Sequence, residues 1–199
     1  QAGAIDIYAS GLSSADLPEI ESAGLQYSKQ NGLYYELTFN PSGSPTFEGT
    51  GKLNPFSSAK VREAMNWLVD RDYINQEVYA GGALAKFFTF TTQFPDYADL
   101  ADVVRQYESK YAYNPEKANE VITAEMEAMG ATLVDGKWNF NGEPVVIILL
   151  IRTDSDGTRV PIGDYVANQL ETIGFTTDRQ YKTSSEASPI WVSGNVADG

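Results

Sequence analysis

The strongest constraint on the fold is a strand–helix–strand pattern in the last third of the chain. Residues 145–151 form an uninterrupted apolar run, which is typical of a strand covered on both faces and is too short to cross a membrane as a helix. A helix of apolar periodicity follows and ends at Gly174, and Phe175 begins a further strand. Strands that alternate with helices indicate α/β layers, with helices packed against a sheet. The apolar side of that helix comprises Val160, Ile162, Tyr165, Val166, Leu170 and Ile173.

The rest of the chain fits the same layered arrangement. We expect strands at 5–8 and 33–39, a short helix after the cap at 13–16, and helices near 99–111 and 115–129. Asp135-Gly136 and Asn141-Gly142 are typical of tight turns next to short strands. The polar segments 41–51 and 182–188 are expected to be mobile surface loops.

A helix pair is predicted between residues 57 and 82, after a short extended element at 54–56. Ser57 or Ser58 can cap the first helix, and Asp70-Arg71-Asp72 separates it from a second helix that ends at Gly81-Gly82. Capping and surface ion pairs are the expected roles of these aspartates, in preference to acid–base catalysis. Trp67 is expected to pack partly at the surface. The buried face of the first helix comprises Val61, Ala64, Met65, Leu68 and Val69.

Composition excludes several functional classes. The 199 residues carry 27 acidic and 14 basic side chains, a net charge of −13, which disfavours binding to nucleic acid or to anionic membranes. The sequence has no histidine and no cysteine, so the usual general base, the commonest metal ligand and a thiol nucleophile are all missing. We therefore expect no enzymatic activity and no cofactor. No secretory signal is found at Gln1, so the sequence is expected to be a mature or excised segment.

Several motifs in a fixed order resemble those of one protein family. They are NPF at 54–56, VREAMNWLVDRDYI at 61–74, GG at 81–82, NPEKA at 114–118 and LETIGF at 170–175. Together they resemble the family 5 extracytoplasmic solute-binding proteins, the receptors of peptide, dipeptide and nickel ABC importers. The resemblance implies one lobe of a periplasmic-binding-protein-like (class II) α/β fold, with a central mixed sheet flanked by helices.

The resemblance also implies how the chain is organised and what it does. Residues 1–8 resemble a phrase that lies far into the full-length receptors. Residues 1–199 are therefore expected to form a single domain, most of the C-terminal lobe, without the N-terminal lobe and the C-terminal return segment. The implied function is capture of a solute outside the cytoplasmic membrane by a protein that is membrane-anchored in its full-length form. The implied partners are a peptide or other small solute, the N-terminal lobe of the same chain and the ABC permease subunits, with no nucleic acid.

The sequence leaves the solute open. Oligopeptides or dipeptides are the first choice and oligosaccharides the second, while a carboxylate-based hydrolase, using a pair such as Asp154 and Asp156 or others brought together by folding, is an alternative from another class. A calcium loop at 154–157 is excluded, because Arg152 and Gly163 occupy positions that need carboxylates, and a capping turn is expected instead. Aromatic side chains can line a ligand cleft or pack in the core. Those expected to bind ligand are Phe87, Phe90, Phe94, Tyr97 and Trp191.

Overall fold

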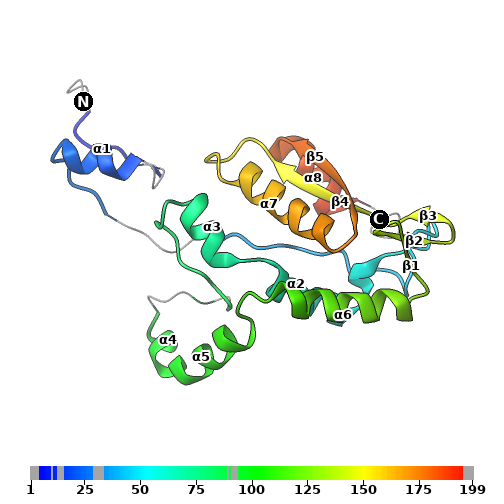
Figure 1. Ribbon diagram of the computed structural model, residues 1–199. Coiled ribbons are helices and arrows are strands. Elements are labelled where there is room, and N and C mark those ends of the chain that lie inside the picture. The colour runs from blue at the N-terminus through cyan, green and yellow to red at the C-terminus, as the bar shows by residue number, and fades with distance from the viewer. Residues whose placement is uncertain are drawn as a thin grey trace.

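The structure is a computed structural model that describes residues 5–9, 11–12, 16–28, 34–88, 90 and 94–194. Helices and strands follow one another as an α/β fold, which confirms the predicted class. Figure 1 shows an elongated molecule, with α1 (Leu17–Ser22) near one end and the short strands β1, β2 and β3 at the other. The hydrophobic core lies between these ends and has two halves.

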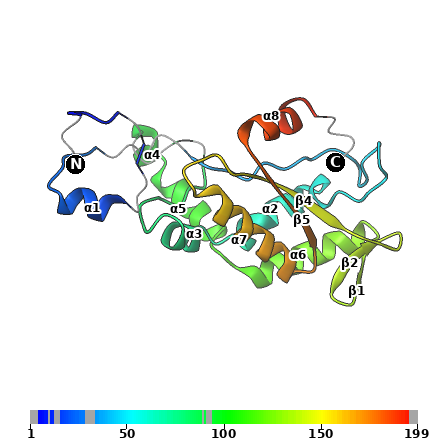
Figure 2. The same cartoon turned by 90° about the horizontal axis from the view of Figure 1, so that it is seen from above.

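A parallel strand–helix–strand unit forms the first half of the core. Strand β4 (Val146–Arg152) pairs with β5 (Thr176–Lys182) along its whole length, and α7 (Arg159–Thr172) connects them. Figures 1 and 2 show α7 on one side of the two strands and α8 (Ser184–Ser193) on the other. This arrangement confirms the predicted strand, helix and second strand.

Only one face of β4 is well covered. Ile147 and Ile151 are 6% and 4% exposed, whereas Val146 and Ile148 on the opposite face are 46% and 51% exposed. Successive side chains of a strand point to opposite faces, so an apolar run fills both faces whether or not both are covered. Helix α8 covers the second face only in part, and the prediction of a strand covered on both faces is wrong.

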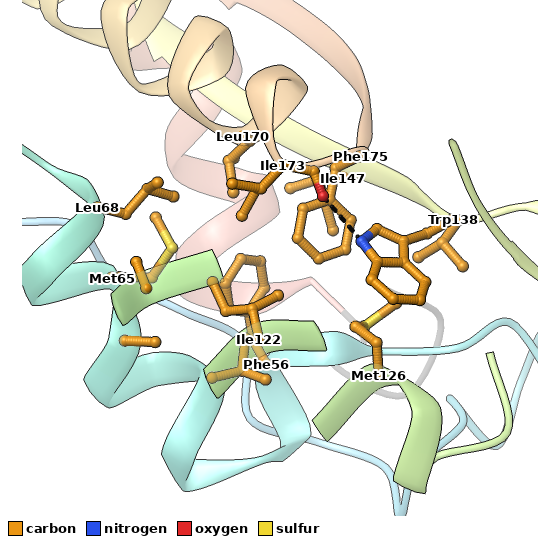
Figure 3. Packing of buried hydrophobic residues seen from close by; sticks show 14 of the residues in the cluster. Phe56, Met65, Leu68, Ile122, Met126, Trp138, Ile147, Leu170, Ile173 and Phe175 are labelled. Carbon is orange, nitrogen blue, oxygen red and sulfur yellow. Dashed lines mark hydrogen bonds between the residues drawn. The ribbon is translucent and has the colours of Figure 1, made fainter. Parts of the chain in front are cut away.

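Helices α2 (Ala59–Leu68) and α6 (Pro115–Ala128) form the second half of the core. The Ser58 hydroxyl accepts hydrogen bonds from two backbone amides of α2, and the Asn114 side chain accepts one from Lys117 in α6. Both caps satisfy amides that have no partner inside the helix. Figure 3 shows the side chains of both halves meeting in one cluster, which includes Phe56, Met65, Leu68, Ile122, Met126, Ile147, Leu170 and Phe175.

Two tight turns shape a separate antiparallel sheet. Strands β1 (Thr132–Val134), β2 (Lys137–Phe140) and β3 (Glu143–Pro144) pair in that order. Both turns have positive φ at two successive residues, 49° and 76° at Asp135 and Gly136 and 52° and 86° at Asn141 and Gly142. This is the geometry of two-residue hairpin loops, as predicted. Among the described residues the strands form two separate sheets, one of three antiparallel strands and one of two parallel strands, so the single central mixed sheet that the resemblance implied is not formed there.

Trp138 joins the antiparallel sheet to the strand–helix–strand unit. Its side chain is 1% exposed, and its Nε1 donates a hydrogen bond to the carbonyl oxygen of Ile173 at 2.9 Å, as Figure 3 shows. Its backbone N–H donates to the carbonyl oxygen of Gly174, also at 2.9 Å. Gly174 has a φ of +96°, and a Cβ there would lie 3.0 Å from the Leu133 side chain. Glycine therefore both ends α7 and allows this close approach.

The two strands predicted at 5–8 and 33–39 are not formed among the described residues. Residues 5–8 and 34–39 have no ladder partner, and Leu33 and the cap residues 13–15 lie outside the described residues. Ile5 and Ile7 are 66% and 83% exposed. A strand is stable only when its backbone groups pair with a neighbour, and the local sequence pattern contains no information about that neighbour.

Three further local predictions are wrong for identifiable reasons. Residues 55–57 form a 3₁₀ turn, η2 (Pro55–Ser57), because the Asn54 side chain accepts a hydrogen bond from the Phe56 amide. Residues 184–188 are helical and belong to α8, which starts with a capping box between Thr183 and Glu186. Trp67 is 5% exposed, and its Nε1 donates to the carbonyl oxygen of Lys110 at 2.7 Å.

Candidate functional site

A pocket of about 320 Å³ lies where three parts of the chain meet. They are the junction of α2 and α3 (Arg71–Glu77), the loop before residue 88, and the junction of α5 (Ala101–Lys110) and α6. Its volume is at the lower end of the range for small-molecule sites. The residues that line it are Val69, Asp70, Arg71, Asp72, Ala85, Phe87, Glu108, Tyr111, Ala112 and Tyr113.

Asp70 lines the pocket and caps α3. Its Oδ1 accepts hydrogen bonds from the amides of Asp72 and Tyr73 at 2.9 and 3.0 Å. Its own amide donates to the Tyr165 hydroxyl of α7 at 3.0 Å, and burial raises the pKa of Tyr165 to about 12. The hydroxyl therefore stays protonated at neutral pH, and the capping role predicted for Asp70 is confirmed.

Arg71 and Phe87 form one wall. The Arg71 guanidinium lies 4.4 Å from the centroid of the Phe87 ring. Its Nη1 and Nη2 donate to the backbone carbonyl and the side-chain oxygen of Asn66 at 3.2 and 2.7 Å. Burial lowers the pKa of Arg71, yet an arginine remains charged at neutral pH. Because Asn66 holds the guanidinium, its face supports the ring of Phe87.

A row of aromatic rings runs from the loop before α4 (Pro95–Asp99) to the core. Phe90 stacks on Phe88 at 5.2 Å between ring centroids and meets the edge of Tyr97 at 6.2 Å. Phe88 contacts Tyr107 at 5.1 Å, and Tyr107 contacts the pocket residue Tyr111 at 5.9 Å. The Tyr97 hydroxyl donates to Glu108 at 3.4 Å. Burial and the Glu108 charge raise the pKa of Tyr97. The row therefore reaches the pocket at Tyr111 and Glu108.

The structure brings together some of the predicted ligand-binding residues and separates others. Phe87 lines the pocket, and Phe90 and Tyr97 belong to the adjoining aromatic row. Phe94 precedes α4 and is 54% exposed, and Trp191 on α8 is 68% exposed. Figures 1 and 2 both show α8 well away from α4 and α5. Trp191 thus lies apart from Phe87, Phe90 and Tyr97.

Sequence reasoning missed several lining residues. The sequence pattern assigns Arg71 to a helix break and gives no role to Glu108, Tyr111 or Tyr113. Glu108 and Tyr111 lie at the end of an amphipathic helix, and Tyr113 lies just before the Asn114 cap. Nothing in their local pattern indicates a pocket. Contacts of Lys110 and Tyr111 with Trp67 of α2 bring this part of the chain there.

The pocket combines charge with apolar surface. Asp70, Asp72 and Glu108 provide three carboxylates against the single guanidinium of Arg71, whose Nη atoms already donate to Asn66. The arrangement favours a positively charged or hydrogen-bond-donating group next to an apolar one. The sequence has no histidine or cysteine, so the pocket offers a binding surface and no nucleophile activated by either of them.

The carboxylate pair of the hydrolase alternative does not have the properties that catalysis requires. A hydrogen bond from the Ser184 amide lowers the pKa of Asp154. Burial acts to raise the pKa of Asp156, but hydrogen bonds from Thr158 and Tyr35 lower it overall. A general acid of a glycosidase needs a raised pKa instead. Asp156 accepts a hydrogen bond from the Thr158 amide in the turn before α7, and Asp154 accepts one from the Ser184 amide at the start of α8, while no side chain caps α7 itself.

Two negative findings apply to the part of the chain that the structure describes. No helix there has the length and apolar character needed to span a bilayer. No group of three or more acidic side chains there is placed to hold a metal ion.

Three solved structures show the fold to which this arrangement is similar. The oligopeptide-binding protein AppA of Bacillus subtilis, in complex with a nonapeptide, is 21% identical with a TM-score of 0.53, over 70% of this chain and 26% of AppA. NikZ from Campylobacter jejuni, in complex with Ni(L-His), is 18% identical with a TM-score of 0.53, over 76% and 26% of the two chains. A periplasmic oligopeptide-binding protein from Thermotoga maritima is 22% identical with a TM-score of 0.52, over 68% and 25%.

The chain spans about a quarter of the length of these proteins. No curated protein matches it. The model of a family described as "Bacterial extracellular solute-binding proteins, family 5 Middle" matches residues 1–197. This match covers nearly the whole sequence and agrees with the motif order between residues 54 and 175. The chain therefore belongs to the family 5 bacterial extracellular solute-binding proteins.

Proposed function

We propose that the protein is the substrate-binding component of an ABC importer and captures dipeptides or oligopeptides. The family match over residues 1–197 carries this proposal. The protein would act outside the cytoplasmic membrane, anchored to it in its full-length form, and would deliver the peptide to the permease subunits. The fold is shared with AppA, which was solved with a nonapeptide, and with NikZ, which was solved with Ni(L-His).

The pocket supports a peptide as the solute. A peptide presents an ammonium group, amide N–H donors and apolar side chains. The carboxylates of Asp72 and Glu108 and the ring of Phe87 offer a partner for each kind of group. An oligosaccharide could contact the aromatic ring and donate hydrogen bonds to the carboxylates. It carries no cation, however, to neutralise the excess negative charge of the pocket. Oligosaccharides are therefore the second candidate.

We further propose that the 199 residues form most of the C-terminal lobe of a two-lobed receptor. The N-terminal lobe of the same chain would cover the solute when the two lobes close. A ligand drives closure only if it contacts both lobes at once in the closed form. An isolated lobe supplies about half of these ligand contacts. The isolated chain should therefore bind peptides weakly or undetectably, whereas a low-micromolar affinity would contradict the two-lobed arrangement.

Calorimetric titration of the full-length receptor with a mixture of short peptides tests the proposal. Phe87→Ala should weaken peptide binding by about tenfold or more, because a buried aromatic contact is lost. Leu133→Ala is the control, since Leu133 is 56% exposed and its strand, β1, lies well away from α3 and α5. If oligosaccharides bind and peptides do not, the peptide proposal is overturned. Equal losses of peptide affinity in Phe87→Ala and in the control would place the site elsewhere. A role in ligand binding stays a prediction for Phe90, Phe94, Tyr97 and Trp191.

A further inference from the structure

The pocket at the α2–α3 junction has more negative than positive charge, and the basic side chains around it are already engaged. The Nη atoms of Arg71 donate to Asn66, and the neighbouring Lys110 pairs with Glu63 at 3.0 Å. Among the residues that the structure describes, no lysine or arginine forms an ion pair with a carboxylate that lines the pocket. A ligand cation would therefore have no competitor for these carboxylates.

Glu108 is the lining carboxylate best placed to bind such a cation. It is half-buried, whereas Asp72 is exposed, and Asp70 Oδ1 already accepts hydrogen bonds from two amides of α3. The described hydrogen bond to Glu108 comes from the Tyr97 hydroxyl at 3.4 Å, which is long for a bond between two oxygens. A carboxylate that is partly withdrawn from water gains more from a cation than an exposed one does.

The negative charge also acts on two tyrosines in or next to the pocket. Burial and the charges of Asp70 and Glu116 raise the pKa of Tyr113, and burial and the charge of Glu108 raise the pKa of Tyr97. The charges that disfavour a phenolate here would favour a cation in the same surroundings.

The remaining walls of the pocket suit the stem of one long side chain. The rings of Phe87, Tyr111 and Tyr113 line it. Lysine and arginine bury their methylene stems against apolar surface while the charged head reaches a polar partner, and a cation also binds well to an aromatic face. A volume of about 320 Å³ is at the lower end of the range for small-molecule sites, so it suits one side chain better than a whole peptide.

We propose that the pocket receives a lysine or arginine side chain of the captured peptide, and that Glu108 is the residue that selects it. The ammonium or guanidinium group would donate hydrogen bonds to the Glu108 carboxylate, and the stem would lie against the aromatic rings. The other residues of the peptide would extend outside the pocket. This inference rests on the proposed function in one respect, that the basic side chain belongs to a captured peptide.

Binding of a small cation tests the pocket without any peptide. The full-length receptor is labelled with p-fluorophenylalanine and freed of bound solute by unfolding and refolding, and the ¹⁹F signal of Phe87 is identified by its loss in Phe87→Leu. n-Butylammonium chloride should shift this signal saturably, and n-butanol in sodium chloride of equal ionic strength should bind several-fold more weakly. Glu108→Gln should weaken the ammonium response several-fold, whereas Glu127→Gln, at an exposed position near the other end of α6, should leave it unchanged. An unmoved Phe87 signal, or equal responses to the amine and the alcohol, would overturn the proposal.

Peptide binding separates this inference from the proposed function. Ala-Lys-Ala should bind more tightly than Ala-norleucine-Ala, which has the same stem without the ammonium group, by about tenfold or more, as expected of a charge-assisted hydrogen bond. Glu108→Gln should remove most of this preference, and Glu127→Gln should preserve it. Equal affinities of the receptor for the two peptides would refute the selection of a basic side chain and keep the peptide function. A saturable ammonium response without binding of any peptide would do the reverse.

Discussion

Replacing Ile122 with alanine should destabilise the folded chain by about 3–4 kcal/mol. Ile122 is a 0% exposed residue of α6 and belongs to the same cluster as Met65 and Leu68 of α2. The substitution removes three carbon atoms, which corresponds to about 2.4 kcal/mol of transfer free energy at about 0.8 kcal/mol for each CH₂ group. The cavity that remains adds to this loss, because surrounding side chains relax only in part.

Urea unfolding followed by tryptophan fluorescence measures this loss. Trp67 and Trp138 are 5% and 1% exposed, so both report on exposure of the core. Val103→Ala is the control, since Val103 on α5 is 43% exposed and should cost less than about 0.5 kcal/mol. A loss below about 1 kcal/mol for Ile122→Ala would refute the packing of α2 against α6.

Three further substitutions test separate features. Asp70→Ala should cost about 1 kcal/mol in urea unfolding because it removes the cap of α3; Asp70→Asn keeps an acceptor and should cost less, and equal losses would contradict the capping role. Gly174→Ala should cost more than about 1 kcal/mol, since φ is +96° there and the new methyl group would contact Leu133; a neutral effect would show that this turn relaxes freely. Hydrogen bonds from Lys60 and Ser58 lower the pKa of Glu125. The ionised Glu125 carboxylate therefore contributes its full stabilisation above the ordinary glutamate pKa of about 4.3, and this stabilisation is lost as the pH falls through the lower pKa of the folded state. Glu125→Gln should reduce the acid dependence of unfolding in that range, and an unchanged dependence would contradict the shift.

The helices and turns could be predicted because their signals are local. Ser58 and Asn114 start helices through contacts with amides two or three residues away, and the positive φ values at Asp135 and Asn141 fall where Asp-Gly and Asn-Gly indicate tight turns. The apolar face of α2 follows from the helical repeat alone, and all of its predicted members are buried. Such features depend on a few neighbouring residues, so one sequence is sufficient to identify them.

Features that depend on distant partners could not be predicted in the same way. The exposure of Val146 and Ile148 depends on how far α8 extends over β4, and residues 34–39 resemble a strand in composition but have no ladder partner among the described residues. Trp67 lies off the apolar stripe of α2, yet Lys110 and Tyr111 bury it from the other side. The same limit applies to the pocket, where Phe87 was predicted and Glu108 was not.

The most direct test of the proposed function is native mass spectrometry of the full-length receptor, purified without refolding so that any bound solute is retained. Peptides of two or more residues should be released on activation, and their masses should be reproduced when the protein is reloaded with synthetic copies. Release of oligosaccharides, or of a nickel complex without peptide, would contradict the account of the pocket as a peptide site.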